Sequence, residues 1–343
     1  MSAAGESMAV VVGLDVGGTK TNATVLSESG VFLIDRMTEA PSCVHQGPAA
    51  AIEALGQAMD LALAITGRSR EAVLAVGLDT PGPASAGGVI SARGATNFAE
   101  PEWWGFDFRG AVERSLHLPV IYNNDGNAAA LYAHQHLFGP DSGRRSSISA
   151  IVGTGLGGGV IESGEVVRGA SGMAGELGHV HIPMDGLLAT GQPVPRCNCG
   201  SVGDLESLAS LSGIENNLLP YWLTRYPDHP LAAEQSLHTA AKLVRGYGER
   251  GDEMAIKIFE QQAMAIGRMF TIASNFTDPD AYFVGGGVIE AAPHFRDWFV
   301  TKVREYTLLR QEQALASTIT LVPDLDMAGA RGSAMAALHA IRP

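Results

Sequence analysis

Cysteine, positive charge and long apolar runs are all scarce in this sequence, and each shortage excludes a class of protein. Three cysteines, Cys43, Cys197 and Cys199, are too few and too unevenly spaced for a disulfide framework. Lysine and arginine number 23 against 36 acidic residues, giving a net charge of −13 and no basic stripe for nucleic acid. The chain has no uninterrupted apolar run of the roughly 18 residues that span a membrane, and residues 1–8 lack the basic start of a signal peptide. We therefore expect a cytoplasmic protein with neither a nucleic-acid partner nor a membrane anchor.

The apolar content, in contrast, is ample. Hydrophobic residues make up 46% of the 343, which is enough for two domains at roughly 150 residues each. Short β-branched runs alternate with longer segments of helical periodicity, which predicts an α/β fold. We expect strands in 9–16, 22–35, 73–78, 120–122, 147–162, 281–284 and 319–324, and helices in 48–67, 107–117, 126–138, most of 206–276, and 328–341.

A strand–glycine turn–strand pattern occurs twice, at 9–26 and at 147–168. This internal echo predicts two related lobes, each with a hairpin that faces a phosphate. In the first copy, adjacent glycines free the backbone N–H groups to bind an anion, and the acidic residue at the strand end suits a water of Mg²⁺. The alternative is a plain hairpin turn. The candidate phosphate-binding residues of this copy are Asp15, Gly17, Gly18, Thr19, Lys20 and Thr21.

The second copy is richer in glycine, with five glycines in the seven residues 153–159. We interpret it as a second phosphate loop with Thr154, Gly155 and Gly157 as contacts, against the alternative of a glycine-rich hairpin alone. Three further glycines, Gly285, Gly286 and Gly287, follow a predicted buried strand and would allow an adenosine to approach the backbone closely.

An aspartate directly after the strand at 120–122 is the candidate general base. Asp125 follows two asparagines and opens a predicted helix, which is where open α/β sheets present ligand groups. An alcohol that attacks a γ-phosphate needs a proton acceptor beside it. The competing interpretation is a helix N-cap.

A polar segment between residues 169 and 206 holds two of the three cysteines. Cys197 and Cys199 lie downstream of His179 and His181, which is a possible zinc constellation. The alternative is a hydrogen-bonded loop histidine and two small buried thiols.

Five motifs in this order resemble those of the ROK family (repressors, open reading frames and kinases) of the actin-like ATPase superfamily. They read LDVGGTKT, GTGLGGG, GASGMAGELGH, CNCGSVGDLE and GGGV, and the match extends from about Val10 to the final helix. The resemblance implies a two-lobed actin-like ATPase (ribonuclease H-like) α/β fold with a cleft between the lobes. We expect a smaller lobe over 8–123, completed by the helix at 328–343, and a larger lobe over 124–327.

The resemblance also implies roles for individual residues. Asp125 matches the catalytic base, and the sugar contacts match Gly82, Asn97, Asn124, Glu176, His179 and Glu206. In the family, the histidine also ligates a structural zinc together with three cysteines. Here the third cysteine is replaced by Asp204, and a segment at 184–196 lengthens the interval before Cys197. Either zinc is bound by His179, Cys197, Cys199 and Asp204, or the site is metal-free and Asp204 caps a helix.

The implied activity is that of an ATP- and Mg²⁺-dependent kinase acting on the 6-hydroxyl of a hexose. Glucose is the first expectation, before N-acetylglucosamine, N-acetylmannosamine or fructose. The family also implies a homodimer or homotetramer. Its transcriptional repressors carry an added N-terminal helix-turn-helix, for which a first strand beginning near Ala9 leaves no room. A sugar-binding protein without catalysis disagrees with the presence of Asp125 and both phosphate motifs.

Overall fold

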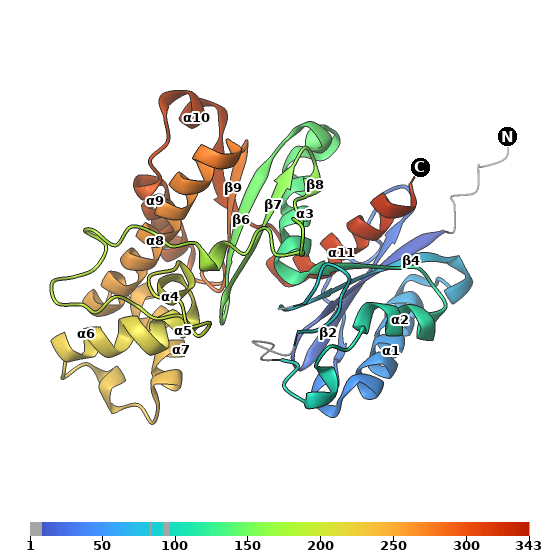
Figure 1. Cartoon of the computed structure of the whole chain (residues 1–343), viewed down its shortest axis with the longest axis horizontal. Helices are drawn as coiled ribbons and strands as arrows, with labels where there is room; N and C mark the ends of the chain where they lie inside the picture. The colour runs from blue at the N-terminus through green and yellow to red at the C-terminus, as the bar shows by residue number, and fades with distance from the viewer. Residues whose placement is uncertain (1–8, 83, 92–96, 343) are drawn as a thin grey trace. The chain divides into compact units, whose positions relative to one another are not determined.

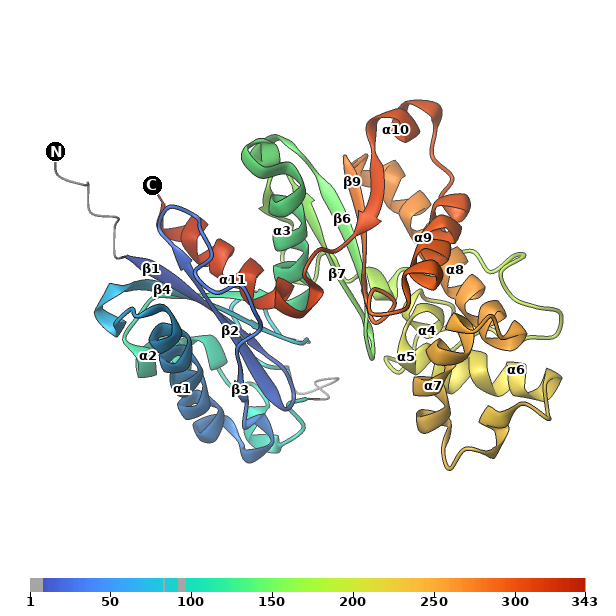
Figure 2. The same ribbon diagram turned by 180° about the vertical axis from the view of Figure 1, so that it is seen from behind.

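The computed structural model describes residues 9–82, 84–91 and 97–342, and Figures 1 and 2 show its ribbon from opposite sides. The chain divides into two units. Unit 1 consists of residues 1–140, 164–175 and 323–343, and unit 2 consists of residues 141–163 and 176–322.

Unit 1 is built on a mixed sheet with the strand order β3-β2-β1-β4-β5. Strand β1 pairs antiparallel with β2 and parallel with β4, and β4 pairs parallel with β5. The strands are β1 Val10–Val16, β2 Lys20–Ser27, β3 Glu39–Pro41, β4 Val73–Thr80 and β5 Val120–Asn124.

Helices cover both faces of this sheet, so β1 is apolar at nearly every position. Val10, Val12 and Leu14 pack in a core with helix α1 (Pro48–Thr66) and helix α2 (Phe108–Leu116). Val11 points the other way and packs against helix α11 (Leu325–Ile341). This is the near-continuous hydrophobic pattern of a strand buried on both sides.

Helix α1 is long and apolar enough to match a membrane span by length and composition alone. Its Ala51, Leu55, Met59 and Leu63 are nevertheless buried in the core of unit 1. A core helix of a globular domain passes the same test of length and composition.

Two glycines bring α11 close to the sheet. A Cβ on Gly13 would lie 1.9 Å from the carbonyl oxygen of Ala330, and one on Gly77 would lie 1.9 Å from that of Ser333. Helix α3 (Asp125–Phe138) also crosses α11 closely, because a Cβ on Gly332 would lie 1.8 Å from the carbonyl oxygen of Ala128.

The second sheet has the order β10-β9-β6-β7-β8, and all of its strands except β8 belong to unit 2. Its strands repeat the pairing of unit 1, since β6 is antiparallel to β7 and parallel to β9, and β9 is parallel to β10. The strands are β6 Ser147–Val152, β7 Leu156–Glu162, β8 Glu165–Val166, β9 Ala281–Gly286 and β10 Thr318–Leu321. Each copy of the strand–glycine turn–strand pattern therefore forms an antiparallel hairpin in its own sheet.

Helices make up most of the rest of unit 2. The central one is α8 (Glu253–Thr277), whose Ile258, Ile266 and Phe270 are fully buried. The others are α4 Glu206–Ala209, α5 Leu211–Gly213, a π-helical turn Ile214–Leu218, α6 Leu219–Arg225, α7 Leu237–Glu249, α9 Pro293–Tyr306 and α10 Gln311–Ala316.

Two boundaries differ from those expected. Residue 124 was the expected start of the second lobe. Helix α3 instead falls in unit 1, because it packs against α11. The last strand ends at Leu321 rather than at 324, since the chain turns at Pro323 and Asp324 into α11.

Candidate functional site

Polar side chains gather at the carboxyl ends of three neighbouring strands of unit 1. Asp15 lies near the end of β1 and is paired in register with Asp79 on β4. Asp79 is in turn paired with Asn123 on β5, and β5 leads directly into Asp125. Parallel strands thus bring together residues that are far apart in the sequence, at the edge where α/β sheets bind ligands.

Asp125 is the first residue of α3, and Asn124 is its N-cap. The Asn124 side-chain oxygen accepts a hydrogen bond from the N–H of Gly126 at 2.9 Å, and Oδ1 of Asp125 accepts from the same N–H at 2.7 Å. The capping position is therefore occupied by Asn124, and the partly buried Asp125 carboxylate lies at the N-terminal, positive end of the helix dipole. A charged carboxylate is the form that accepts a proton.

Asp79 is a polar residue of this edge that the sequence motifs did not identify. Its side chain is fully buried, and Oδ2 accepts a hydrogen bond from the Ser333 hydroxyl at 2.6 Å. Burial raises the pKa of Asp79 well above its usual range, and the nearby Asp15 and Asp125 carboxyls add to the rise. Burial also raises the pKa of Asp15. The available signal was an acidic residue at the end of a strand, as in β1.

The first glycine-rich turn joins β1 to β2. Its Gly17 N–H donates to the carbonyl of Lys20 at 2.8 Å, and Thr19 is exposed. The Lys20 ammonium forms an ion pair with Glu39, so its positive charge is compensated by that carboxylate. Thr21, in contrast, is buried.

Two sugar contacts implied by the resemblance lie near these groups. The side-chain oxygen of Asn97 would be 2.7 Å from a Cβ on Gly18, and the amide nitrogen of Asn124 would be 3.2 Å from a Cβ on Gly82. Both glycines thus face the neighbouring amide side chains without a side chain of their own between them.

The second glycine-rich turn, in unit 2, is shorter than its sequence indicates. Gly153 and Thr154 are exposed in the turn, whereas Gly157 is part of β7. Two short contacts hold the turn, since the Ser212 hydroxyl donates to the carbonyl of Thr154 at 2.8 Å and the Leu211 N–H donates to that of Gly153 at 3.0 Å.

The three glycines at 285–287 have a packing role. Gly286 has a φ of +99°, and a Cβ there would lie 1.8 Å from the carbonyl oxygen of Val152, so only glycine fits. A Cβ on Gly285 would lie 2.9 Å from Val322. The guanidinium of Arg245 donates to the carbonyl of Gly287 and pairs with Glu290 at 2.9 Å, which adds a cation that the sequence motifs did not identify.

Two acidic residues of unit 2 were expected to hold the sugar. Glu206, at the start of α4, accepts from the Leu156 N–H at 2.8 Å and from the Cys197 thiol at 3.3 Å. Burial raises the pKa of Glu176, the charge of Glu206 adds to the rise, and His179 opposes it. Each carboxylate is partly buried, which suits the binding of hydroxyl groups.

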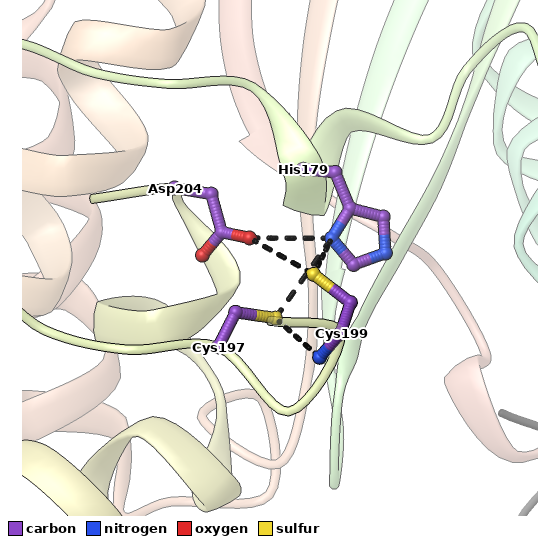
Figure 3. A group of neighbouring side chains, drawn as sticks. All are labelled: His179, Cys197, Cys199 and Asp204. Atoms are coloured by element: carbon purple, nitrogen blue, oxygen red, sulfur yellow. Dashed lines mark hydrogen bonds and ion pairs between the residues drawn. The ribbon is translucent and has the colours of Figure 1, made fainter. Parts of the chain in front are cut away.

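His179, Cys197, Cys199 and Asp204 form a compact cluster whose ligand atoms all lie within 4.8 Å of one another (Figure 3). Nδ1 of His179 is 3.3 Å from Oδ2 of Asp204 and 3.6 and 3.9 Å from the two sulfurs. Zinc bonds of about 2.0–2.3 Å place tetrahedral ligands roughly 3.3–3.8 Å apart, so these residues fit the ion. Asp204 also accepts from the Ser207 N–H at 3.0 Å through Oδ1, and this leaves Oδ2 facing His179.

The segment at 184–196 packs beside this cluster. Gln192 accepts from the amide of Gln261 on α8 at 2.7 Å, Arg268 donates to the carbonyl of Asp185 at 2.7 Å, and the Met184 methyl would be 3.3 Å from a Cβ on Gly203. The added segment therefore connects the loop that carries Cys197 and Cys199 to α8, the central helix of unit 2.

The chain is similar in sequence and in structure to known proteins. The ROK family matches residues 11–340 of this chain. A glucokinase of Halalkalibacterium halodurans is 31% identical over 284 residues, which cover 82% of this chain and 81% of the relative. The crystal structure of a ROK hexokinase from Thermus thermophilus aligns with a TM-score of 0.74 at 30% identity, covering 97% of this chain and 99% of that one. A ROK family glucokinase from Streptomyces griseus in complex with glucose and AMPPNP aligns with a TM-score of 0.69 at 28% identity, covering 96% and 99%.

Proposed function

Because the chain belongs to the ROK family, we propose that it is an ATP-dependent hexokinase that phosphorylates the 6-hydroxyl of glucose. The family resemblance and the actin-like ATPase fold are confirmed by the match over residues 11–340 and by the aligned ROK structures. The observation that carries the proposal is the carboxylate of Asp125, held by the Gly126 N–H at the start of α3. The similarity to glucokinases, one of them in complex with glucose and AMPPNP, supports the choice of sugar and nucleotide.

In the proposed reaction, Asp125 accepts the proton of the sugar hydroxyl as that oxygen attacks the γ-phosphorus of ATP. The bond from the γ-phosphorus to its bridging oxygen breaks, and ADP leaves. Positioning and electrostatic stabilisation supply most of the rate in such a transfer. The backbone N–H groups of the turns at 17–19 and 153–155 face the phosphates, and the side chains of Thr19 and Thr154 are exposed to assist them.

Asp15 would hold Mg²⁺, which would neutralise charge on the phosphoryl oxygens. The proposed sugar contacts are Gly82, Asn97 and Asn124 of unit 1 and Glu176, His179 and Glu206 of unit 2. The glycines at 285–287 accept the adenosine. We further propose a structural zinc held by His179, Cys197, Cys199 and Asp204, on the basis of their tetrahedral spacing.

ADP release with a panel of hexoses tests this function. Glucose is expected to give the highest kcat/KM, above N-acetylglucosamine, N-acetylmannosamine and fructose. Preference for an N-acetylated sugar would replace glucokinase by an N-acylhexosamine kinase, and the absence of turnover with every sugar would exclude the kinase assignment.

We also propose a homodimer or homotetramer in the cytoplasm, where ATP is available. Three large apolar side chains, Phe276, Leu308 and Leu315, are 84%, 73% and 81% exposed in unit 2. The Leu308 N–H bonds to Thr271 and the Gln313 side chain bonds to Ser274, so the segments that carry these apolar residues lie together at the end of α8. Light scattering after size exclusion measures the mass, and a monomer would contradict the proposal.

A further inference from the structure

We propose that Asp79 and Asp15 together ligate the divalent cation that accompanies the nucleotide, which makes Asp79 a cation ligand outside the glycine-rich motifs. The inference rests on the proposed phosphoryl transfer for its biological use. Its evidence lies in the sheet of unit 1.

The register of the sheet places these two carboxyl groups side by side. Asp15 on β1 is the direct partner of Asp79 on the parallel strand β4, so both side chains leave the sheet on the same face. Helix α11 covers that face. A Cβ on Gly329 would lie 2.7 Å from Oδ2 of Asp15, and Ser333 bonds Oδ2 of Asp79 at 2.6 Å. The glycine leaves room for the first carboxylate, and the serine orients the second.

Among the described residues, one oxygen of Asp79 has no hydrogen-bond partner apart from the neighbouring Asp15 carboxyl. Asp79 is 0% exposed, and its Oδ1 is buried without a hydrogen-bond donor among residues 9–82, 84–91 and 97–342. The two carboxyl groups lie within hydrogen-bonding reach of each other. An octahedral Mg²⁺ with bonds of about 2.1 Å holds adjacent oxygens about 3 Å apart, which is also a hydrogen-bond distance. Such a pair is joined either by a shared proton or by a shared cation.

The charges around Asp79 favour the cation. The groups that perturb its carboxyl are Asp15, Asp125 and the hydroxyl of Ser333, and no lysine or arginine is among them. Buried carboxylates without a counter-charge are costly, whereas a cation compensates them. The third carboxylate, Asp125, begins the helix after the next strand of the same sheet.

Asp79→Asn separates the two possibilities. The asparagine amide can donate a hydrogen bond to Asp15, so it reproduces a shared proton but removes one anionic ligand. The experiment measures Mn²⁺ binding to the full chain in the presence of ADP. Binding is detected as a loss of the electron paramagnetic resonance signal of free Mn²⁺. We expect the Mn²⁺ affinity to fall by about tenfold or more. Asp60→Asn, which makes the same change at an exposed carboxylate paired with Arg70 outside this site, is the matched control and is expected to retain the full affinity.

Unchanged Mn²⁺ affinity in Asp79→Asn would overturn the proposal and assign a shared proton to the pair. If that variant does not fold, Asp79→Ser serves in the same titration, and the rise in Tm on adding Mg²⁺ is a second readout. We expect Mg²⁺ to raise the Tm of the parent protein more than that of Asp79→Asn or Asp79→Ser, and an equal rise would contradict the proposal. Both readouts are independent of turnover, so loss of the hexokinase assignment would leave this result standing.

Discussion

The backbone N–H of Leu156 donates a hydrogen bond to Oε2 of Glu206 at 2.8 Å. This bond joins β7, the strand after the second glycine-rich turn, to α4, the helix after the loop that carries Cys197, Cys199 and Asp204. Oε1 of the same carboxylate accepts from the thiol of Cys197 at 3.3 Å. One carboxylate therefore connects the proposed phosphate turn with the proposed metal site, and a change at Glu206 is expected to affect both.

Replacing Glu206 by alanine is expected to weaken the binding of both substrates. The Leu156 N–H loses its acceptor and the sugar loses a hydroxyl partner, so the KM for glucose and the Kd for ATP should each rise about tenfold, equivalent to about 1.4 kcal/mol. Steady-state kinetics and calorimetry measure the two constants. Glu215→Ala, which removes only an ion pair with His238 at the surface, is the control. If only the glucose constant changed, Glu206 would have no role in positioning the phosphate turn.

Asp125→Asn should remove the base and keep the fold. Asparagine is nearly isosteric and can still accept from the Gly126 N–H, so we expect glucose affinity within about twofold of the parent, while kcat falls by about 10²–10⁴-fold. Stopped assays and calorimetry measure both. Asp107→Asn changes the N-cap of α2, which also accepts from a backbone N–H, at 2.9 Å, and it should leave kcat intact. Near-normal turnover in Asp125→Asn would assign the base elsewhere.

Asp204→Asn separates metal binding from helix capping. The asparagine oxygen can still accept from the Ser207 N–H, as Oδ1 of Asp204 does at 3.0 Å, but it is a much weaker zinc ligand. We expect about one zinc per parent chain by elemental analysis and at least tenfold weaker zinc binding in the variant. Cys43→Ser, outside the cluster, should retain the metal. A purified parent that takes up no zinc would show that Asp204 serves only as a cap.

The buried Asp79 predicts how stability changes with pH when divalent cations are removed. Its pKa in the folded protein is raised above the 3.8 of an ordinary aspartate, so the folded state retains this proton longer than the unfolded state does. As pH rises from 3.8 through the folded pKa, the parent chain should lose unfolding free energy, and Asp79→Asn should not lose this contribution. Urea unfolding in a chelator at several pH values measures the difference. A gap between the two proteins that is the same at every pH would contradict the assignment of the shift to Asp79.

Gly13→Ala tests the close packing of α11 on the first sheet. The added methyl would lie 1.9 Å from the carbonyl oxygen of Ala330 and 2.8 Å from the nitrogen of Ala334. Because both are backbone atoms, relief requires a shift of the helix, and we expect a loss of about 3 kcal/mol or more in unfolding free energy. Gly143→Ala, where a Cβ meets nothing within 4 Å, is the control and should be close to neutral. Urea unfolding compares the two variants.

The local pattern of the sequence was enough to predict most strands and helices, the duplicated hairpin and the position of Asp125 at the start of a helix. These features follow from short-range rules of periodicity and of helix starts. The sequence left the role of the glycines open, since Gly157 and Gly286 lie in strands and Gly286 closely approaches the backbone of Val152. A run of glycines has the same appearance in a sequence whether it faces a ligand or a neighbouring strand.

The sequence by itself determined the α/β class, the family and the residues that carry its motifs, because each of these is written in neighbouring residues. Only the tertiary structure decided that Asp79 lies beside Asp15, that Glu206 bonds to Leu156 and that α3 packs with α11. These relationships depend on strand register and helix packing between distant segments. Register is fixed by the burial of whole sheet faces, so no local stretch of the chain contains it.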